Sequence, residues 1–189
     1  MSEDANKELA AEAAIANTAA DAIGLLKADH RAVENLFAAF QQAGDTDLEV
    51  KGALAQRACE ELTVHTMIEE EILYPIAHHA LDRRDEIDVD EAYVEHYLVK
   101  TLIAKFDSLK PGDRGFDATF KVMSEMVRHH IEEEESALFP ELRESKLDLV
   151  RLGELIAAQK AELVKKLEAA GSKLVGDGSL TFRPSRELT

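Results

Sequence analysis

Two eleven-residue segments of this chain share one pattern: a histidine, a glutamate four residues later, and a proline six residues after that glutamate. They read HTMIEEEILYP, from His65 to Pro75, and HIEEEESALFP, from His130 to Pro140. Residues four apart lie on one face of an α-helix, so each segment can direct a histidine and a glutamate to one point. One such pair is common on a solvated helix face, but two copies with matched surroundings indicate a shared site.

An isolated histidine precedes each of these segments. His30 lies 35 residues before His65, and His96 lies 34 residues before His130. Measured from the nearest chain breaker at a rise of 1.5 Å per residue, the four histidines stand about 21 to 27 Å along their helices. Antiparallel neighbouring helices would therefore return all four histidines to a similar level.

Apolar spacing and helix breakers predict five helices and no strand longer than a few residues. The helices are expected at about residues 21–42, 47–74, 89–109, 116–139 and 146–170. Pro75 should end or kink the second helix, with 76–81 continuing beyond it, and Pro140 should interrupt the fourth. The predicted fold is all-α: a four-helix bundle over 21–145, an additional C-terminal helix over 146–170, an N-terminal helical arm over 1–20 and a flexible tail over 171–189.

Composition excludes several functional classes. Apolar residues make up 46% of the chain and proline and glycine are scarce, which favours long helices around an aliphatic core. The formal net charge of −16 argues against binding to nucleic acid or to an anionic membrane surface. The single cysteine, Cys59, allows no intrachain disulfide and is expected to be a small core residue. No secretion signal or membrane-spanning run is apparent, so a cytoplasmic protein is expected.

Each of the four histidines falls within an apolar helical stripe, which places it in the core. Burying four imidazoles with two carboxylates is unfavourable without a metal or a complete hydrogen-bond network. Imidazole and carboxylate ligands together suit iron, with manganese as the second choice, and bundle cores commonly hold such pairs of ions. The predicted metal ligands are His30, His65, Glu69, His96, His130 and Glu134.

The arrangement H…HxxxE…H…HxxxE resembles the hemerythrin, or HHE cation-binding, family over roughly residues 21–145. The resemblance implies an up-down-up-down four-helix bundle that holds two non-haem iron ions. It also implies that the four histidines are terminal ligands and that Glu69 and Glu134 bridge the two metals.

The sequence departs from the oxygen-carrying members of that family at two positions. Those proteins have a fifth histidine four residues after the third-helix histidine, where this chain has Lys100. Their second carboxylate is an aspartate five residues after its histidine, whereas Glu134 stands four residues after His130. Fewer histidines leave more open coordination, which favours reaction with small oxidants such as H₂O₂, O₂ or NO over reversible oxygen storage.

Two functions stay open at this stage. The first is a reactive di-iron protein, with peroxide decomposition as one activity, and the second is an iron or oxygen sensing or storage module without turnover. A homodimer is also left open.

Several residues near the predicted ligands are secondary candidates. Glu34 and Glu61 stand four residues from a site histidine, and Tyr93 shares the face of His96. The remaining glutamates of the runs 69–71 and 132–135 are expected on solvated faces. His78 and His79 are expected near the end of the bundle, exposed or capping.

Overall fold

The computed structural model describes residues 21–81 and 86–169, and within these ranges all regular structure is helical. The predicted N-terminal arm and C-terminal tail lie outside the described residues. The elements are α2 (Ala22–Gln42), α3 (Leu48–Ile68), the π-helix η1 (Glu69–Leu73), α4 (Tyr74–Ala80), α5 (Glu86–Phe106), α6 (Phe116–Glu133), the π-helix η2 (Glu134–Leu138), α7 (Phe139–Glu144) and α8 (Leu149–Ala169).

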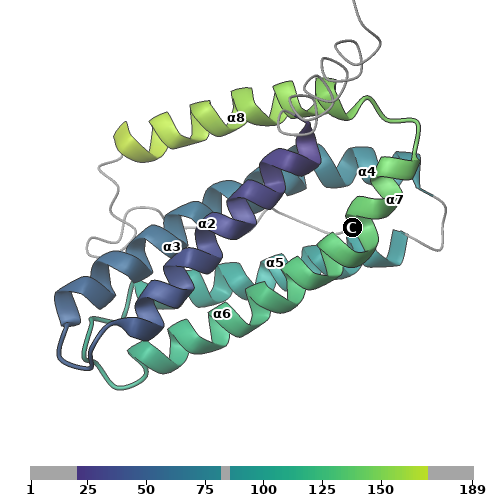
Figure 1. Ribbon diagram of the computed structural model, residues 1–189. Helices are drawn as coiled ribbons and strands as arrows, with labels where there is room; N and C mark the ends of the chain where they lie inside the picture. Colours follow the sequence, from purple (N-terminus) through teal and green to yellow (C-terminus); the bar gives the residue numbers. More distant parts are fainter. Residues whose placement is uncertain (1–20, 82–85, 170–189) are drawn as a thin grey trace, which may run out of the picture.

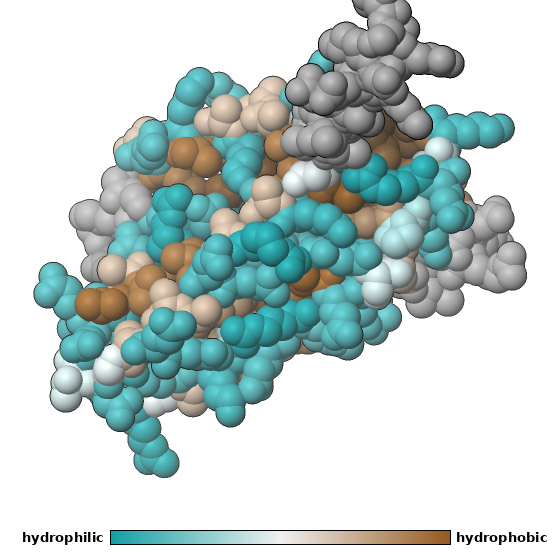
Figure 2. Space-filling view, viewed as in Figure 1, coloured by the Kyte–Doolittle hydropathy of each residue, from teal (hydrophilic) through white to brown (hydrophobic). Residues whose placement is uncertain are grey.

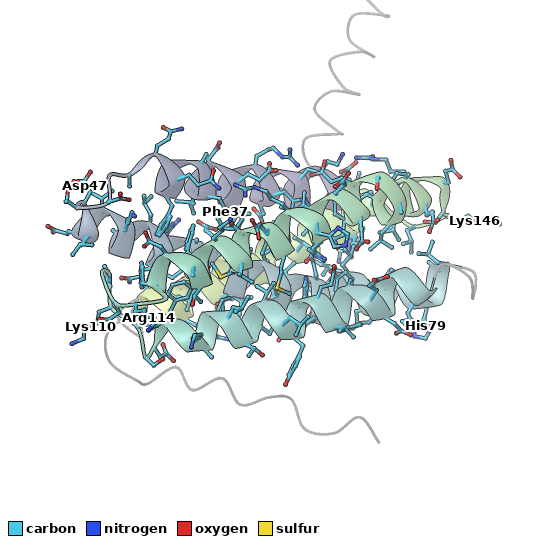
Figure 3. The ribbon with its side chains drawn as sticks, turned by 90° about the horizontal axis from the view of Figure 1, so that it is seen from below. Phe37, Asp47, His79, Lys110, Arg114 and Lys146 are labelled. Carbon is cyan, nitrogen blue, oxygen red and sulfur yellow. The ribbon has the colours of Figure 1, made fainter. Side chains whose placement is uncertain are left out.

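The bundle consists of four long rods (Figure 1). These are α2, α3 continued by η1 and α4, α5, and α6 continued by η2 and α7. Consecutive rods run antiparallel, α2 beside α3 and α5 beside α6, while α2 also contacts α6 and α3 contacts α5. Figure 3 shows the turns at Asp47 and at Lys110 and Arg114 at one end, with His79 and Lys146 at the other. The predicted all-α, up-down-up-down bundle is confirmed.

The two prolines do not end their helices; each helix widens by one residue and continues. Proline has no N–H to donate, and its ring clashes with the carbonyl four residues earlier. The chain resolves this with a π-turn, in which the N–H of Tyr74 bonds to the carbonyl of Glu69 and the N–H of Phe139 bonds to that of Glu134. Both π-turns begin at the glutamate of an HxxxE segment.

Two apolar clusters divide the core along the bundle axis. One contains Ile23, Leu26, Leu73 and Leu138, near the end capped by α4 and α7. The other is rich in aromatic side chains and lies toward the opposite end, around Phe37, Phe40, Phe106, Phe116 and Phe120. The four histidines fall between the two clusters. Within the second cluster the predicted core residue Cys59 is 1% exposed, and burial raises the pKa of its thiol to about 12.

The additional helix α8 lies outside the bundle, against α2 and α3 (Figure 1). It buries Leu152, Ile156 and Leu163. It begins three residues later than the predicted start because the side chain of Asp148 accepts a hydrogen bond from the N–H of Arg151 (2.9 Å), as an N-terminal cap does.

The surface of the face drawn in Figure 2 is mostly hydrophilic, with hydrophobic residues appearing in the furrows between helices. None of the described helices is both long enough and apolar enough to cross a membrane.

Candidate metal centre

The six side chains singled out by the doubled pattern meet between the two apolar clusters. Glu69, at the start of η1, links the two helix pairs: its Oε2 lies 3.1 Å from Nε2 of His65 on α3 and 3.3 Å from Nε2 of His96 on α5. A buried carboxylate thus faces one imidazole from each pair.

Glu134, at the start of η2, occupies the corresponding place in the second half of the chain. Its Oε2 lies 3.2 Å from Nε2 of His30 on α2 and 3.6 Å from Nε2 of His130 on α6. Each of these six residues is at most 7% exposed. Their ligand atoms form two groups, His30, His65, Glu69 and Glu134, and Glu69, His96 and His130, each compact enough to hold a metal ion.

Carboxylates behind the imidazoles set which ring nitrogen carries the proton. Nδ1 of His30 lies 2.9 Å from Glu135, and Nδ1 of His96 lies 3.1 Å from Glu70. Because an ionised carboxylate can only accept a hydrogen bond, Nδ1 must donate, and the lone pair of Nε2 is left pointing into the site.

His130 is held in the same way, because its Nδ1 lies 2.8 Å from Glu95. Nδ1 of His65 faces Asp29 at 3.8 Å, which is beyond hydrogen-bond distance, and it has no hydrogen-bond partner. All four imidazoles nevertheless have Nε2 within 3.6 Å of a site glutamate.

The polar atoms at the centre are not satisfied by the protein itself. Nε2 of His30, Nε2 of His65, Oε1 of Glu69 and Oε2 of Glu134 are buried without a hydrogen-bond partner. The Nε2 atoms of His96 and His130 lie only 3.1 Å apart, and both carry lone pairs once Nδ1 is protonated. Unsatisfied buried acceptors are unfavourable, and a cation would satisfy all of them at once, so the donor set fits a metal pair.

Three of the four outer carboxylates are in turn held by basic side chains. Glu70 binds Lys100, Glu135 binds Lys27 and Arg31, and Asp29 binds Lys160 of α8. The expectation that the glutamates beside Glu69 and Glu134 lie on solvated faces is therefore wrong for Glu70 and Glu135.

A sequence signal for these four carboxylates exists in retrospect. The residue before each isolated histidine (Asp29, Glu95) faces Nδ1 of the histidine in the HxxxE segment that follows, at 3.8 Å in the first half of the chain and 2.8 Å in the second. The residue after each site glutamate (Glu70, Glu135) supports an isolated histidine on the other helix pair. The same two relations hold in both halves of the chain.

Tyr74 enters the site, although the sequence pointed to Tyr93 instead. The hydroxyl of Tyr74 donates to Oε1 of Glu134 (2.9 Å) and lies 3.2 Å from Nε2 of His96. Burial, followed by the charges of Glu134 and Glu69, raises the pKa of Tyr74 well above its usual value, so this group acts as a hydrogen-bond donor. Phe139 holds the matching position in the second half and stacks on His30.

Removing the Tyr74 hydroxyl should lower stability. In the metal-free protein, the Tyr74→Phe variant leaves Glu134 buried with one hydrogen bond fewer, at a cost of about 1–3 kcal/mol. We expect the melting temperature to fall by about 2–10 °C in thermal unfolding followed by circular dichroism. Tyr97→Phe is the matched control, because Tyr97 is 60% exposed. Equal melting of the two variants would contradict the role given to Tyr74.

The remaining candidates lie outside the centre. Glu34 pairs with Arg31 and Glu61 pairs with Arg57. The hydroxyl of Tyr93 donates to the backbone carbonyl of Glu70 (3.4 Å), and the Tyr93 ring packs edge-on against Tyr74 rather than contacting a ligand atom.

The spare histidines also stay away from the centre. His78 pairs with Asp90 and His129 with Glu133. Side chains of His78 and His129 are 37% and 62% exposed, so neither adds a fifth imidazole.

Protonation of the two site glutamates is unequal. Burial and then the charge of Glu134 raise the pKa of Glu69 well above its usual value. Burial also acts on Glu134, but the neighbouring His130 and His30 outweigh it and lower its pKa. Burial lowers the pKa of His65 to about 4, so this imidazole is neutral at pH 7. The raised pKa of Glu69 favours its protonated form, and a cation bound by this carboxylate would compete with that proton.

Sequence comparison with known families gives one match that covers most of this chain. The sequence model of the hemerythrin HHE cation binding domain matches residues 21–142. This chain belongs to the hemerythrin HHE family. The matched range contains every histidine and glutamate of the centre, so the His/Glu groups described above are those of a cation-binding domain.

Relatives of this hemerythrin domain include two curated proteins. One, named a DNA nickase, from Nostoc sp. (strain PCC 7120), is 27% identical over 150 residues, which cover 79% of this chain and 39% of that protein. The other, an uncharacterized hemerythrin-like protein from Schizosaccharomyces pombe, is 28% identical over 112 residues, which cover 59% of this chain and 54% of that protein. The chain thus spans about half or less of the length of these relatives.

A solved structure shares the fold of this hemerythrin domain. It is the crystal structure of a hemerythrin HHE cation binding domain-containing protein from Mycobacterium kansasii, with a TM-score of 0.66 and 23% sequence identity. The match covers 82% of this chain and 99% of that one.

Proposed function

We propose that this chain is a non-haem di-iron protein that reacts with small oxidants, namely H₂O₂, O₂ or NO, at the centre formed by His30, His65, Glu69, His96, His130 and Glu134. The observation that carries the proposal is the convergence of four imidazole Nε2 atoms and two buried carboxylates whose hydrogen bonding is incomplete. An iron pair bound there would supply the electrons that reduce an oxidant, or accept them. Manganese is the second choice for the same ligands.

Lys100 supports reaction over reversible oxygen storage. At this position, where oxygen-carrying hemerythrins have a fifth histidine, the Lys100 ammonium pairs with Glu70, which in turn holds Nδ1 of His96. The lysine therefore orients an existing imidazole and adds none. Four histidines and two glutamates offer fewer protein ligands than two six-coordinate ions would use, which leaves positions for an exogenous molecule.

Tyr74 and the apolar surroundings fit the same proposal. The Tyr74 hydroxyl donates its proton to Glu134, and its oxygen lies 3.2 Å from Nε2 of His96, so a hydroxyl group stands beside two of the proposed ligands. Phe139 and Leu138, both at most 2% exposed, supply apolar surroundings next to the site. A buried donor beside an open position can stabilise charge that develops on a bound oxidant.

The test is to load the full chain with iron, measure metal content, and mix the reduced protein with O₂ in a stopped-flow spectrometer. We expect about two irons per chain, as the two ligand groups imply, and fast oxidation without a lasting oxygenated species. Oxygen evolution from H₂O₂ by the oxidised protein should exceed that of the metal-free protein. A stable, reversible O₂ adduct with no peroxide turnover would contradict the proposal.

A sensing or storage module without turnover is the second candidate, and one contact favours it. Lys160 of α8 binds Asp29, which lies behind His65, so α8 contacts a residue next to one of the proposed ligands. The measurement is the rate of proteolysis within α8 before and after the addition of iron or O₂. A change in that rate, together with no peroxide turnover, would favour this alternative.

A further inference from the structure

A pocket of about 140 Å³ lies between α5 and η2, and its lining includes two residues of the metal centre. Exposed Ser136 lies among its lining residues, and so do the buried site residues His130 and Glu134. A second cavity, which is lined by all four site histidines and by apolar residues such as Val33 and Leu62, measures only about 10 Å³. That is barely room for one water molecule. Of these two cavities, only the larger has room for an ion that keeps part of its hydration shell, or for a small molecule.

The walls of this pocket are negatively charged. Glu91, Glu95 and Glu133 line it, and no lysine or arginine is among its described lining residues. Glu95 also differs from the other carboxylates behind the histidines. Whereas each of those binds a lysine or arginine, the outer oxygen of Glu95 lies 4.0 Å from Nε2 of the exposed His129. The negative potential of this wall is therefore poorly compensated by the side chains that the structure describes.

One residue in the lining of this pocket is a buried carboxylate with an unsatisfied oxygen. Glu134 is 2% exposed, and its Oε2 atom has no hydrogen-bond partner. An acidic patch on a surface is by itself ordinary. Here the acidic residues share one pocket with Glu134 and His130 of the metal centre, so the patch adjoins the proposed ligands.

We infer that this pocket is the port through which divalent metal ions reach the centre, and that Glu91 and Glu133 draw them in while Glu95 holds His130. The inference rests on the proposed metal centre. A cleft lined by one sign of charge focuses the electric field and raises the association rate of the opposite charge. Carboxylate oxygens also suit hard divalent ions, so the walls can replace part of the hydration shell on the way inward.

The test is the rate at which the metal-free full chain takes up Co(II), followed by stopped-flow visible absorbance at low salt. We expect the Glu91→Gln/Glu133→Gln variant to take up Co(II) about 10-fold more slowly than the unmodified protein, with the same final content. Ser136→Lys, which adds a positive charge at the outer part of the pocket, should slow uptake in the same way. In 1 M salt, where charges are screened over about 3 Å, the differences should nearly vanish.

The matched control is Glu49→Gln/Glu168→Gln, which removes the same net charge from α3 and α8, away from the pocket. Its uptake rate should stay close to that of the unmodified chain. The port would be ruled out if both double variants slowed Co(II) uptake equally. It would also be ruled out if the pocket variants bound Co(II) fully at an unchanged rate. Neither outcome would contradict the metal centre itself. Absence of Co(II) binding to the unmodified chain would overturn the metal centre and the port together.

Discussion

The Glu134→Ala variant is expected to lose nearly all of its iron. Oε2 of Glu134 faces one histidine from each helix pair, so its removal takes a ligand atom from the region that both ions would share. Loss of a residue that only orients a metal ligand typically weakens metal binding by about 10- to 100-fold. Loss of a direct ligand should weaken metal binding by more than about 100-fold. The measurement is iron content after dialysis, by elemental analysis, together with the near-ultraviolet and visible absorbance of the oxidised protein.

Two further variants grade this effect by distance from the centre. Glu135→Gln keeps every proposed ligand but weakens the support of Nδ1 of His30 (2.9 Å), so we expect an affinity loss of about 10- to 100-fold. Glu71→Ala is the control, because Glu71 is exposed and contacts Gln159 of α8 rather than the centre. Its iron content should equal that of the unmodified chain. If Glu134→Ala kept full iron content, the proposed ligand set would be wrong.

Removing the metal should lower the melting temperature by on the order of 10 °C. An ion that binds only the folded state stabilises it by about 4 kcal/mol when its concentration is a thousand times Kd. In a protein of this size, each kcal/mol changes the melting temperature by about 2–4 °C. The metal-free centre also leaves Glu69 and Glu134 side by side in the core, which burial makes unfavourable. Scanning calorimetry of iron-loaded and chelator-treated protein measures the difference.

The direction of the pH effect follows from Glu69. Its pKa is raised in the metal-free fold, by burial and then by Glu134, which favours its protonated form. Stabilisation by iron should therefore decrease as the pH falls, because protons compete with the metal for the same carboxylate. In Glu134→Ala the melting temperature should respond little to iron at any pH. Superimposable melting curves for loaded and metal-free protein would mean that the metal is not bound in the core.

Helix positions and the level of the site could be predicted from the chain itself. Apolar spacing placed α2 and α6 within one residue of their observed starts, and the similar distances from the turns predicted that His30, His65, His96 and His130 would meet. These predictions succeed because a regular helix converts residue number directly into height and direction. The starts of α5 and α8 were misplaced by three residues, since caps and turn contacts decide helix ends.

What the sequence determined by itself is the pair of HxxxE segments with their isolated histidines, hence an all-α bundle with six inward polar groups. Tertiary structure alone decided what surrounds them. In a regular α-helix Tyr74 would point about 140° away from Glu69. The π-turn before Pro75 brings Tyr74 back over Glu69, so that its hydroxyl reaches Glu134. Glu70 likewise supports a histidine of another helix only because two rods cross at a particular rotation. Periodicity fixes faces within one element, whereas contacts between elements depend on how the rods pack.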